Sequence, residues 1–220
     1  MSETLLHAAL KAWYGMPNDQ IEVPVDGYII DIVRDDLLIE VQTQHFGSIR
    51  SKLADLVKTH AVRLVHPIAR EKWIVKLAPD GQSHLSRRKS PKRGKVLHLF
   101  DELVYVPALM SNPNFSLEVL LIQEEEIRRH EPGRRWRRRG WVTHERRLLQ
   151  VLDSRLFCAP EDVHELLPKE MLQPFTTSDL AAILEVPRRL AQKMTYCLRE
   201  MGTIEAVGKE GNAILYVRSC

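Results

Sequence analysis

Two acidic residues lie in adjacent apolar segments near the N-terminus. Asp31 lies in the β-branched segment 28–33, and Glu40 lies in the apolar segment 37–42. The residues between them, 34–36, carry two aspartates that favour a tight turn, so we expect the segments to pair as a hairpin. Because facing residues of paired strands are neighbours, Asp31 and Glu40 are predicted to lie close together. The sequence thus predicts two converging carboxylates in an apolar sheet.

Carboxylates in such a setting are costly to bury unless a cation compensates them. Asp31, Glu40 and the carbonyl of Val41 offer the hard oxygen ligands that Mg²⁺ or Mn²⁺ prefers. A metal held there would lower the pKa of a bound water and neutralise a scissile phosphate, while Gln42 orients the water or the phosphate. The alternative is an ordinary edge strand, in which acids alternate with apolar residues on one wet face.

The elements that must position these side chains follow one another over residues 2–77. Helical spacing of apolar residues predicts helices over 4–14 and 48–60, and β-branched runs predict three strands between them. Two further apolar runs, 61–68 and 73–77, are separated by the turn-like residues 69–72. This order predicts an α/β (α+β) fold with a mixed sheet and helices on its faces.

Over about residues 3–77 the sequence resembles the PD-(D/E)XK nuclease superfamily, which has a restriction-endonuclease-like fold. The resemblance is carried by the leading helix, by Gly27 to Asp31 as the G-x-x-x-D strand, and by Glu40-Val41-Gln42 as the E-x-K strand. It implies that Asp31 and Glu40 are metal ligands and that Gln42 stands at the catalytic lysine position. It also implies an extra acid at Glu3. Lys52, on the next helix, is a candidate for the displaced lysine, because an amide carries no positive charge.

The middle of the chain holds the excess positive charge. Residues 86–147 carry 15 basic and 8 acidic side chains, whereas residues 1–85 carry 9 and 11 and residues 148–220 carry 8 and 10. Residues 78–95 are predicted to form a basic loop, 96–110 a helix, and 116–127 either a strand or a helix. Nine arginines and two tryptophans then lie within 128–147. Such a cluster favours a polyanionic partner, although the arginines could instead pair with Glu124-Glu125-Glu126.

The C-terminal third resembles winged-helix domains over about residues 141–220. A helix is predicted over 143–157, a capping box at Thr176 opens a short helix, and Pro187 starts a second helix that Gly202 ends. Segments 203–207 and 213–217 then predict a hairpin. The resemblance implies DNA contact through the second helix, although winged helices also serve as dimerisation or protein-docking modules.

These patterns predict a nuclease-like domain over 1–127, an arginine-rich connector over 128–140 and a winged-helix domain over 141–220. The expected partner is nucleic acid, with DNA preferred, and a homodimer stays open. The expected contacts are Arg87, Arg88, Lys89, Lys92, Arg93, Arg134, Arg135, Arg137, Arg138, Arg139, Arg188, Arg189, Gln192 and Lys193.

Three cysteines without a C-x-x-C spacing, together with the absence of any 18-residue apolar run, predict a cytoplasmic protein outside the membrane. Three functions follow as hypotheses. They are a Mg²⁺-dependent DNA endonuclease, a catalytically inactive DNA-binding regulator with the nuclease fold, and a protein-protein assembly module.

Overall fold

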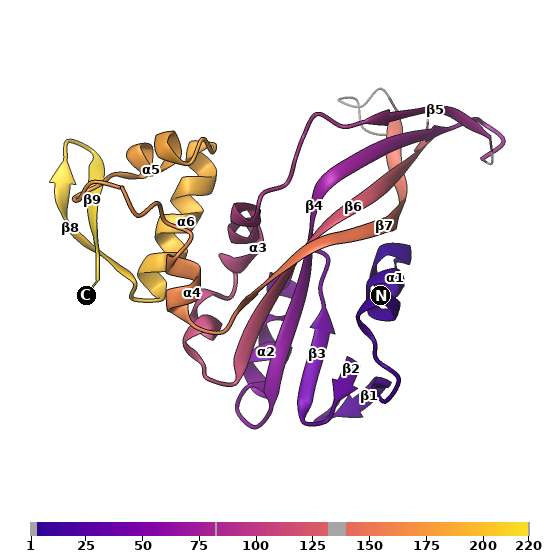
Figure 1. Cartoon of the computed structure of the whole chain (residues 1–220), viewed down its shortest axis with the longest axis horizontal. Helices are drawn as coiled ribbons and strands as arrows, with labels where there is room; N and C mark the ends of the chain where they lie inside the picture. Colours follow the sequence, from indigo (N-terminus) through magenta and orange to yellow (C-terminus); the bar gives the residue numbers. More distant parts are fainter. Residues whose placement is uncertain (1–3, 82, 132–139, 220) are drawn as a thin grey trace.

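A computed structural model of the chain describes residues 4–81, 83–131 and 140–219, and combines one large mixed sheet with several helices (Figure 1). The first half contains α1 (Leu5–Tyr14), β1 (Gln20–Val25), β2 (Tyr28–Arg34), β3 (Leu37–Val41), the 3-10 turn η1 (Phe46–Ile49), α2 (Arg50–Leu56), β4 (Ala61–Leu77), β5 (His84–Lys89), η2 (Val96–Leu99) and α3 (Phe100–Leu103). The second half contains η3 (Pro107–Ser111), β6 (Phe115–His130), β7 (Trp141–Phe157), α4 (Pro160–His164), α5 (Thr177–Ile183), α6 (Arg188–Glu200), β8 (Ile204–Glu210) and β9 (Ala213–Arg218).

The large sheet has the order β1-β2-β3-β4-β6-β7, and β5 pairs with the far half of β4. Strand β3 runs parallel to β4 and β4 runs parallel to β6, whereas the other pairs are antiparallel. The expected α/β class with a mixed sheet flanked by helices is therefore confirmed. The strands containing Asp31 and Glu40 are β2 and β3, which pair as the predicted hairpin.

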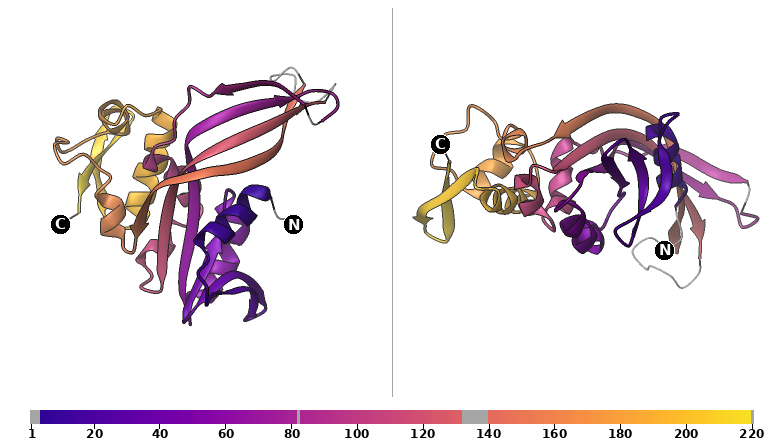
Figure 2. Two further views of the ribbon diagram at one scale, coloured as in Figure 1. Left: turned by 45° about the vertical axis from the view of Figure 1, so that its right-hand side comes forward. Right: turned by 90° about the horizontal axis from the view of Figure 1, so that it is seen from below.

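Helices cover both faces of this sheet (Figure 2). On one face, Leu6, Leu10 and Tyr14 of α1 recur every four residues and pack in a core with apolar side chains of β2, β3, β4 and β6. On the other face, α2 and α3 bury Leu53 and Leu103 in a second core. In β3, β4 and β6, alternate residues supply the two cores, as the pleat requires.

The second core is continuous with the C-terminal third of the chain. It includes Phe157 of β7, Leu190 and Met194 of α6, and Tyr216 of β9. The capping box at Thr176 is confirmed, since its hydroxyl oxygen accepts from the Asp179 N–H and Asp179 Oδ2 accepts from the Thr176 N–H. The predicted second helix and hairpin are confirmed as α6, β8 and β9, with Pro187 as the residue before α6 rather than its first residue.

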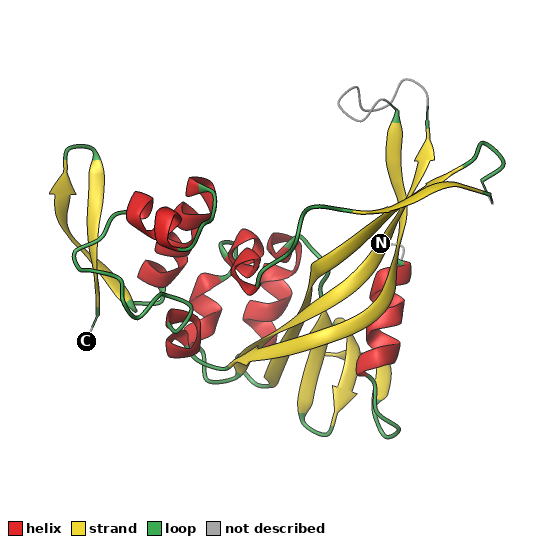
Figure 3. Ribbon diagram, turned by 45° about the horizontal axis from the view of Figure 1, so that its top comes forward, coloured by secondary structure: helices red, strands yellow, loops and turns green. Residues whose placement is uncertain are grey.

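The far ends of the long strands project away from the body (Figures 1 and 3). We call this projection the arm; it consists of residues 73–77 of β4, 84–89 of β5, 125–130 of β6 and 141–147 of β7, which pair side by side. The arm and the C-terminal hairpin lie at opposite ends of the molecule (Figure 1). Helix α1 lies below the arm (Figures 1 and 2).

Three local expectations are wrong, and one ambiguity is resolved. Residues 143–157 belong to strand β7 rather than to a helix, so the sheet extends past the predicted boundary near Gly140 to Phe157. Residues 69–72 are part of the continuous strand β4, with a bulge between Ala69 and Glu71, rather than a turn. Residues 84–89 form β5 instead of a loop. The ambiguous segment 116–127 is a strand, β6.

A network of buried charges holds the base of the arm together. Glu124 and Glu126 are 2% and 4% exposed, and Lys72 Nζ lies 2.9 Å from Glu124 Oε1 and 3.2 Å from Glu126 Oε2. Arg128 Nε and Thr143 Oγ1 each donate to Glu126 Oε1 at 2.8 Å. Burial alone would raise the pKa of Glu126, but these hydrogen bonds and the charge of Lys72 lower it to about 2. Three strands, β4, β6 and β7, are thus tied through one carboxylate.

Among the described residues, no helix is both long enough and apolar enough to cross a membrane.

Replacing Glu126 by glutamine should destabilise the fold by about 2 to 3 kcal/mol at pH 7, because a pKa lowered by two units or more corresponds to roughly this free energy. The folded-state pKa lies below the unfolded value, so the stabilisation is present above pH 4.5 and is lost as the pH falls toward 2. Chemical denaturation at pH 7 and at pH 3 should therefore give a smaller difference at pH 3.

The matched control is Glu125→Gln, because Glu125 pairs with the exposed Arg87 instead. That substitution should cost less than about 1 kcal/mol at either pH. An equal cost for the two glutamates would contradict the assignment of the network.

Candidate functional site

The two carboxylates predicted to converge do lie together, Asp31 in the middle of β2 and Glu40 near the end of β3. The paired register ends at Ile32 opposite Ile39, and Asp31 and Glu40 are the next residues beyond it. Glu40 Oε1 accepts from the backbone N–H of Asp31 at 3.3 Å, and Asp31 Oδ2 accepts from that of Val41 at 2.9 Å. The two side chains are 17% and 8% exposed, and both line a cavity of about 490 Å³ that we call the carboxylate cavity.

Lys52 supplies the positive charge beside Glu40. It is the third residue of α2, next to Leu53, which is buried against the sheet. Its Nζ donates to Glu40 Oε1 and to the carbonyl of Ile29, both at 2.5 Å. Burial raises the pKa of Glu40 above its usual value, and the ammonium group of Lys52 only partly offsets this rise. The structure therefore brings together Asp31, Glu40 and Lys52 from three elements.

Helix α1 contributes two further side chains that sequence reasoning missed. His7 Nε2 lies 3.1 Å from Asp31 Oδ2, and Lys11 Nζ lies 3.9 Å from Asp31 Oδ1 and 2.6 Å from Glu22 Oε1. Burial would raise the pKa of Asp31, but the hydrogen bonds from His7 and Val41 lower it below its usual value. The available signal was the spacing of His7 and Lys11, which places them four residues apart on one face of a helix.

Gln42 lines the same cavity, but its side chain serves the backbone of its own loop. Its Nε2 donates to the carbonyls of Gln44 and His45, at 2.6 Å and 3.4 Å. Its backbone carbonyl accepts from His66 Nδ1 at 2.8 Å, since Pro67, further along β4, has no N–H to donate. Burial lowers the pKa of His66, which keeps its ring neutral. The basic side chain beside Glu40 is thus Lys52, and Gln42 does not contact either carboxylate through its amide.

The donor set of the cavity suits a hard divalent cation. Asp31 and Glu40 provide two carboxylates, and Val41 lies in the cavity wall. Within the described ranges, no group of three or more His, Cys, Asp and Glu side chains is placed to hold a metal. A cation here would therefore take its remaining ligands from carbonyl groups, water and substrate, as Mg²⁺ does at sites with few carboxylates. Glu3, proposed as an extra acid, lies outside the described residues.

The basic residues predicted to contact nucleic acid are divided by the fold. On the arm, Arg87 Nε lies 2.6 Å from Glu125 Oε1 and Lys89 Nζ lies 2.8 Å from Glu71 Oε1, so both charges are paired. Three others are exposed and form no ion pair with any described residue: Arg88, Lys92 and Arg93. The five arginines of the predicted connector lie outside the described residues: Arg134, Arg135, Arg137, Arg138 and Arg139.

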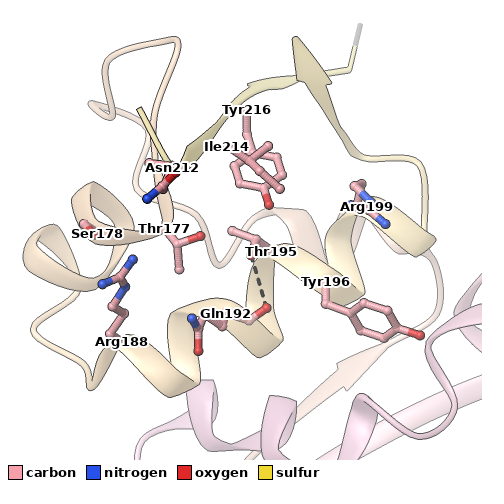
Figure 4. A pocket seen from close by; sticks show the side chains of 11 residues that line it. Thr177, Ser178, Arg188, Gln192, Thr195, Tyr196, Arg199, Asn212, Ile214 and Tyr216 are labelled. Atoms are coloured by element: carbon pink, nitrogen blue, oxygen red, sulfur yellow. Dashed lines mark hydrogen bonds between the residues drawn. The ribbon is translucent and has the colours of Figure 1, made fainter. Parts of the chain in front are cut away.

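The predicted recognition helix α6 presents its polar residues unevenly. Arg188 and Gln192 line a cavity of about 290 Å³ between α5, α6 and the β8–β9 hairpin (Figure 4). Arg189 is exposed. Lys193 is paired instead with α3, where its Nζ lies 2.8 Å from Asp101 Oδ1. Three of the four predicted contacts on α6 are therefore available to a partner.

Comparisons with known proteins identify relatives without assigning a chemistry. A family model described as a domain of unknown function, DUF8091, matches residues 4–158. A protein of Treponema pallidum (strain Nichols), described as uncharacterized, is 32% identical to this chain over 216 residues, which cover 97% of this chain and 84% of the relative. No solved structure matches the chain with significance. The family match ends close to Phe157, where β7 leaves the sheet.

Replacing Lys52 by methionine should destabilise the protein by about 3 kcal/mol, because it leaves the buried carboxylate of Glu40 without its cation. The double variant with Glu40→Gln should recover much of that loss, since both charges are then absent. Urea denaturation of the wild type, both single variants and the double variant completes the cycle. The control is Lys58→Met, whose exposed partner is Asp55; a loss as large there would contradict a special role of Lys52.

Proposed function

The chain belongs to the DUF8091 family, whose description assigns no activity, and we propose that it is a divalent-metal-dependent nuclease that hydrolyses phosphodiester bonds of DNA. One observation carries this proposal: Asp31, Glu40 and Lys52, from β2, β3 and α2, converge on one cavity. Two carboxylates beside one ammonium group can hold a cation and a phosphate at the same place.

In this proposal Asp31 and Glu40 hold Mg²⁺ or Mn²⁺, with the carbonyl of Val41 as a further ligand. The bound cation would supply a water of lowered pKa and would neutralise charge on the scissile phosphate. Lys52 is now paired with Glu40. Once a cation compensates Glu40, the ammonium group would be released to contact the phosphate or the attacking water. His7 positions the Asp31 carboxylate, which accepts from it and from the Val41 N–H at the same oxygen.

The surroundings support a nucleic-acid substrate. The element order of a leading helix, a strand with Asp31, a strand with Glu40 and a helix with Lys52 is the order that the resemblance to PD-(D/E)XK nucleases predicts. The order α5, α6, β8, β9 resembles a winged helix, whose second helix exposes Arg188, Arg189 and Gln192. Nucleic acid bound by these residues and by the free arm cations would be held through its phosphates, without sequence readout.

The alternative is a DNA-binding regulator with this fold but without the reaction. The observation that favours it is the pairing of both carboxylates with basic side chains, Glu40 with Lys52 and Asp31 with His7. Such pairing stabilises the site without a metal, and Gln42 cannot supply a second cation. Cleavage assays separate the two functions.

Cleavage of plasmid or branched DNA should require Mg²⁺ or Mn²⁺ and should stop on addition of EDTA. Asp31→Asn and Glu40→Gln should each lower the rate by about a hundredfold or more, since each removes a charged metal ligand. The matched control is Asp55→Asn, because Asp55 is an exposed aspartate of α2 outside the cavity. Cleavage that survives both ligand substitutions would rule out this metal site. Salt-sensitive binding without any cleavage would support the regulator.

Lys52 and Gln42 should differ in the same assay. Lys52→Ala should lower the rate by about a hundredfold, whereas Gln42→Ala should change it by less than about tenfold, because the Gln42 amide is bound to the carbonyl of Gln44. Rates are measured at saturating metal, and thermal melts check that both variants fold. A larger loss of rate in Gln42→Ala than in Lys52→Ala would contradict the role proposed for Lys52 and would assign that role to Gln42.

A further inference from the structure

A second cavity lies at the tip of the arm, away from the carboxylates. It has a volume of about 650 Å³ and lies between the turn after β4 and the ends of β6 and β7. We call it the tip cavity. Its apolar wall contains Leu77, Pro79 and Leu85, and its polar wall contains Arg129, His130, Trp141 and the acidic Asp80. We propose that the tip cavity binds one unpaired nucleotide of the nucleic acid, with the base against Trp141 and the phosphate at Arg129.

This inference rests on the proposed function, because the nucleotide belongs to the nucleic acid that the carboxylate cavity is proposed to cleave. It deepens that function by naming a substrate class, a nucleic acid with an unpaired segment.

Trp141 is held in place by its neighbours in the sheet. It pairs across the strands with His130, whose ring centroid lies 5.3 Å away at an interplanar angle of 66°. Lys76 Nζ lies 4.5 Å from the centroid of the indole ring. A ring fixed on paired strands stacks on a base with little loss of side-chain entropy, and stacking of this kind accepts any base.

Unpaired positive charge lies beside this ring. Elsewhere on the arm, Arg87, Lys89 and Arg128 are each paired with a glutamate. Arg129 and Lys76 form no ion pair with any residue that the structure describes. The guanidinium group of Arg129 reaches the turn at Gly81. An unpaired guanidinium group near an aromatic ring matches the phosphate and the base of one nucleotide.

The shape of the cavity favours an unpaired nucleotide over a duplex. Bases within a duplex are stacked on one another and expose only their edges, so their flat faces cannot reach an aromatic side chain. A cavity of about 650 Å³ is within the range that small ligands occupy. Its walls come from two hairpins of the sheet, which are tied at their base through Glu126. An extruded or single-stranded nucleotide can enter such a space.

The test is binding of the full-length protein to fluorescent 12-nucleotide single-stranded DNA, single-stranded RNA and blunt duplex DNA, measured by anisotropy in EDTA. Trp141→Ala should weaken single-strand binding by about tenfold, and Trp141→Phe should largely restore it, because stacking contributes this much per base. Duplex affinity should change by less than about twofold. Arg129→Gln, which leaves the ring in place, should also weaken single-strand binding selectively. The DNA and RNA arms reveal which single strand is preferred.

Two matched controls use side chains outside the tip cavity. Trp13→Ala removes an exposed tryptophan of α1, and Arg88→Gln removes an unpaired arm cation, and neither should alter the preference for single strands. Equal losses for single strands and duplex, or unchanged binding in both Trp141→Ala and Arg129→Gln, would overturn the inference.

Failure of this inference is distinguishable from failure of the proposed function. Trp141-dependent single-strand binding without any metal-dependent cleavage would support the tip cavity and contradict the nuclease. Cleavage that depends on Asp31 and Glu40, combined with single-strand binding that ignores Trp141 and Arg129, would support the nuclease and overturn the tip cavity.

Discussion

The burial of two carboxylates side by side is the constraint on which the rest of the structure depends. Asp31 and Glu40 lie where β2 and β3 meet, and neither could stay charged there without compensation. Compensation comes from three directions: the backbone N–H groups of the strands, Lys52 from α2, and His7 with Lys11 from α1. Both helices must therefore dock on opposite faces of the sheet with the correct rotation before the site is complete.

The parts of the site that sequence reasoning predicted are those with local determinants. Asp31 and Glu40 follow from strand alternation and one short turn, and Lys52 follows from its place at the start of the next helix. His7 and Lys11 could not be assigned in this way, because they meet Asp31 only when α1 packs across the sheet. Gln42 was assigned to the site by its position in the motif. In the structure its side-chain amide is bound to the 43–45 loop, and its backbone carbonyl is bound to His66, because Pro67 has no N–H to offer.

The fold was predicted well where strands are regular and badly where they bulge. Along β7, the pairing with β6 passes over His144, Leu149 and Leu152, so each is an extra residue in the strand. These insertions break the alternation of period two, and the apolar residues of β7 then recur at spacings that resemble a helix. Arg70 of β4 is passed over in the same way. Because of this extra residue, the sequence predicted two strands and a turn where the structure has one continuous strand.

The same three bulges have a consequence for the behaviour of the protein in solution. Strand β7 is the edge of the large sheet and is 17 residues long, with Leu149, Leu152 and Leu156 exposed. A straight edge of that length would be a template for the strands of other molecules. Each bulge bends the strand and interrupts the row of unpaired N–H and C=O groups, so no long uninterrupted stretch is left for an incoming chain. The irregularity that hid β7 in the sequence is thus one of the devices that discourage edge-to-edge pairing of strands.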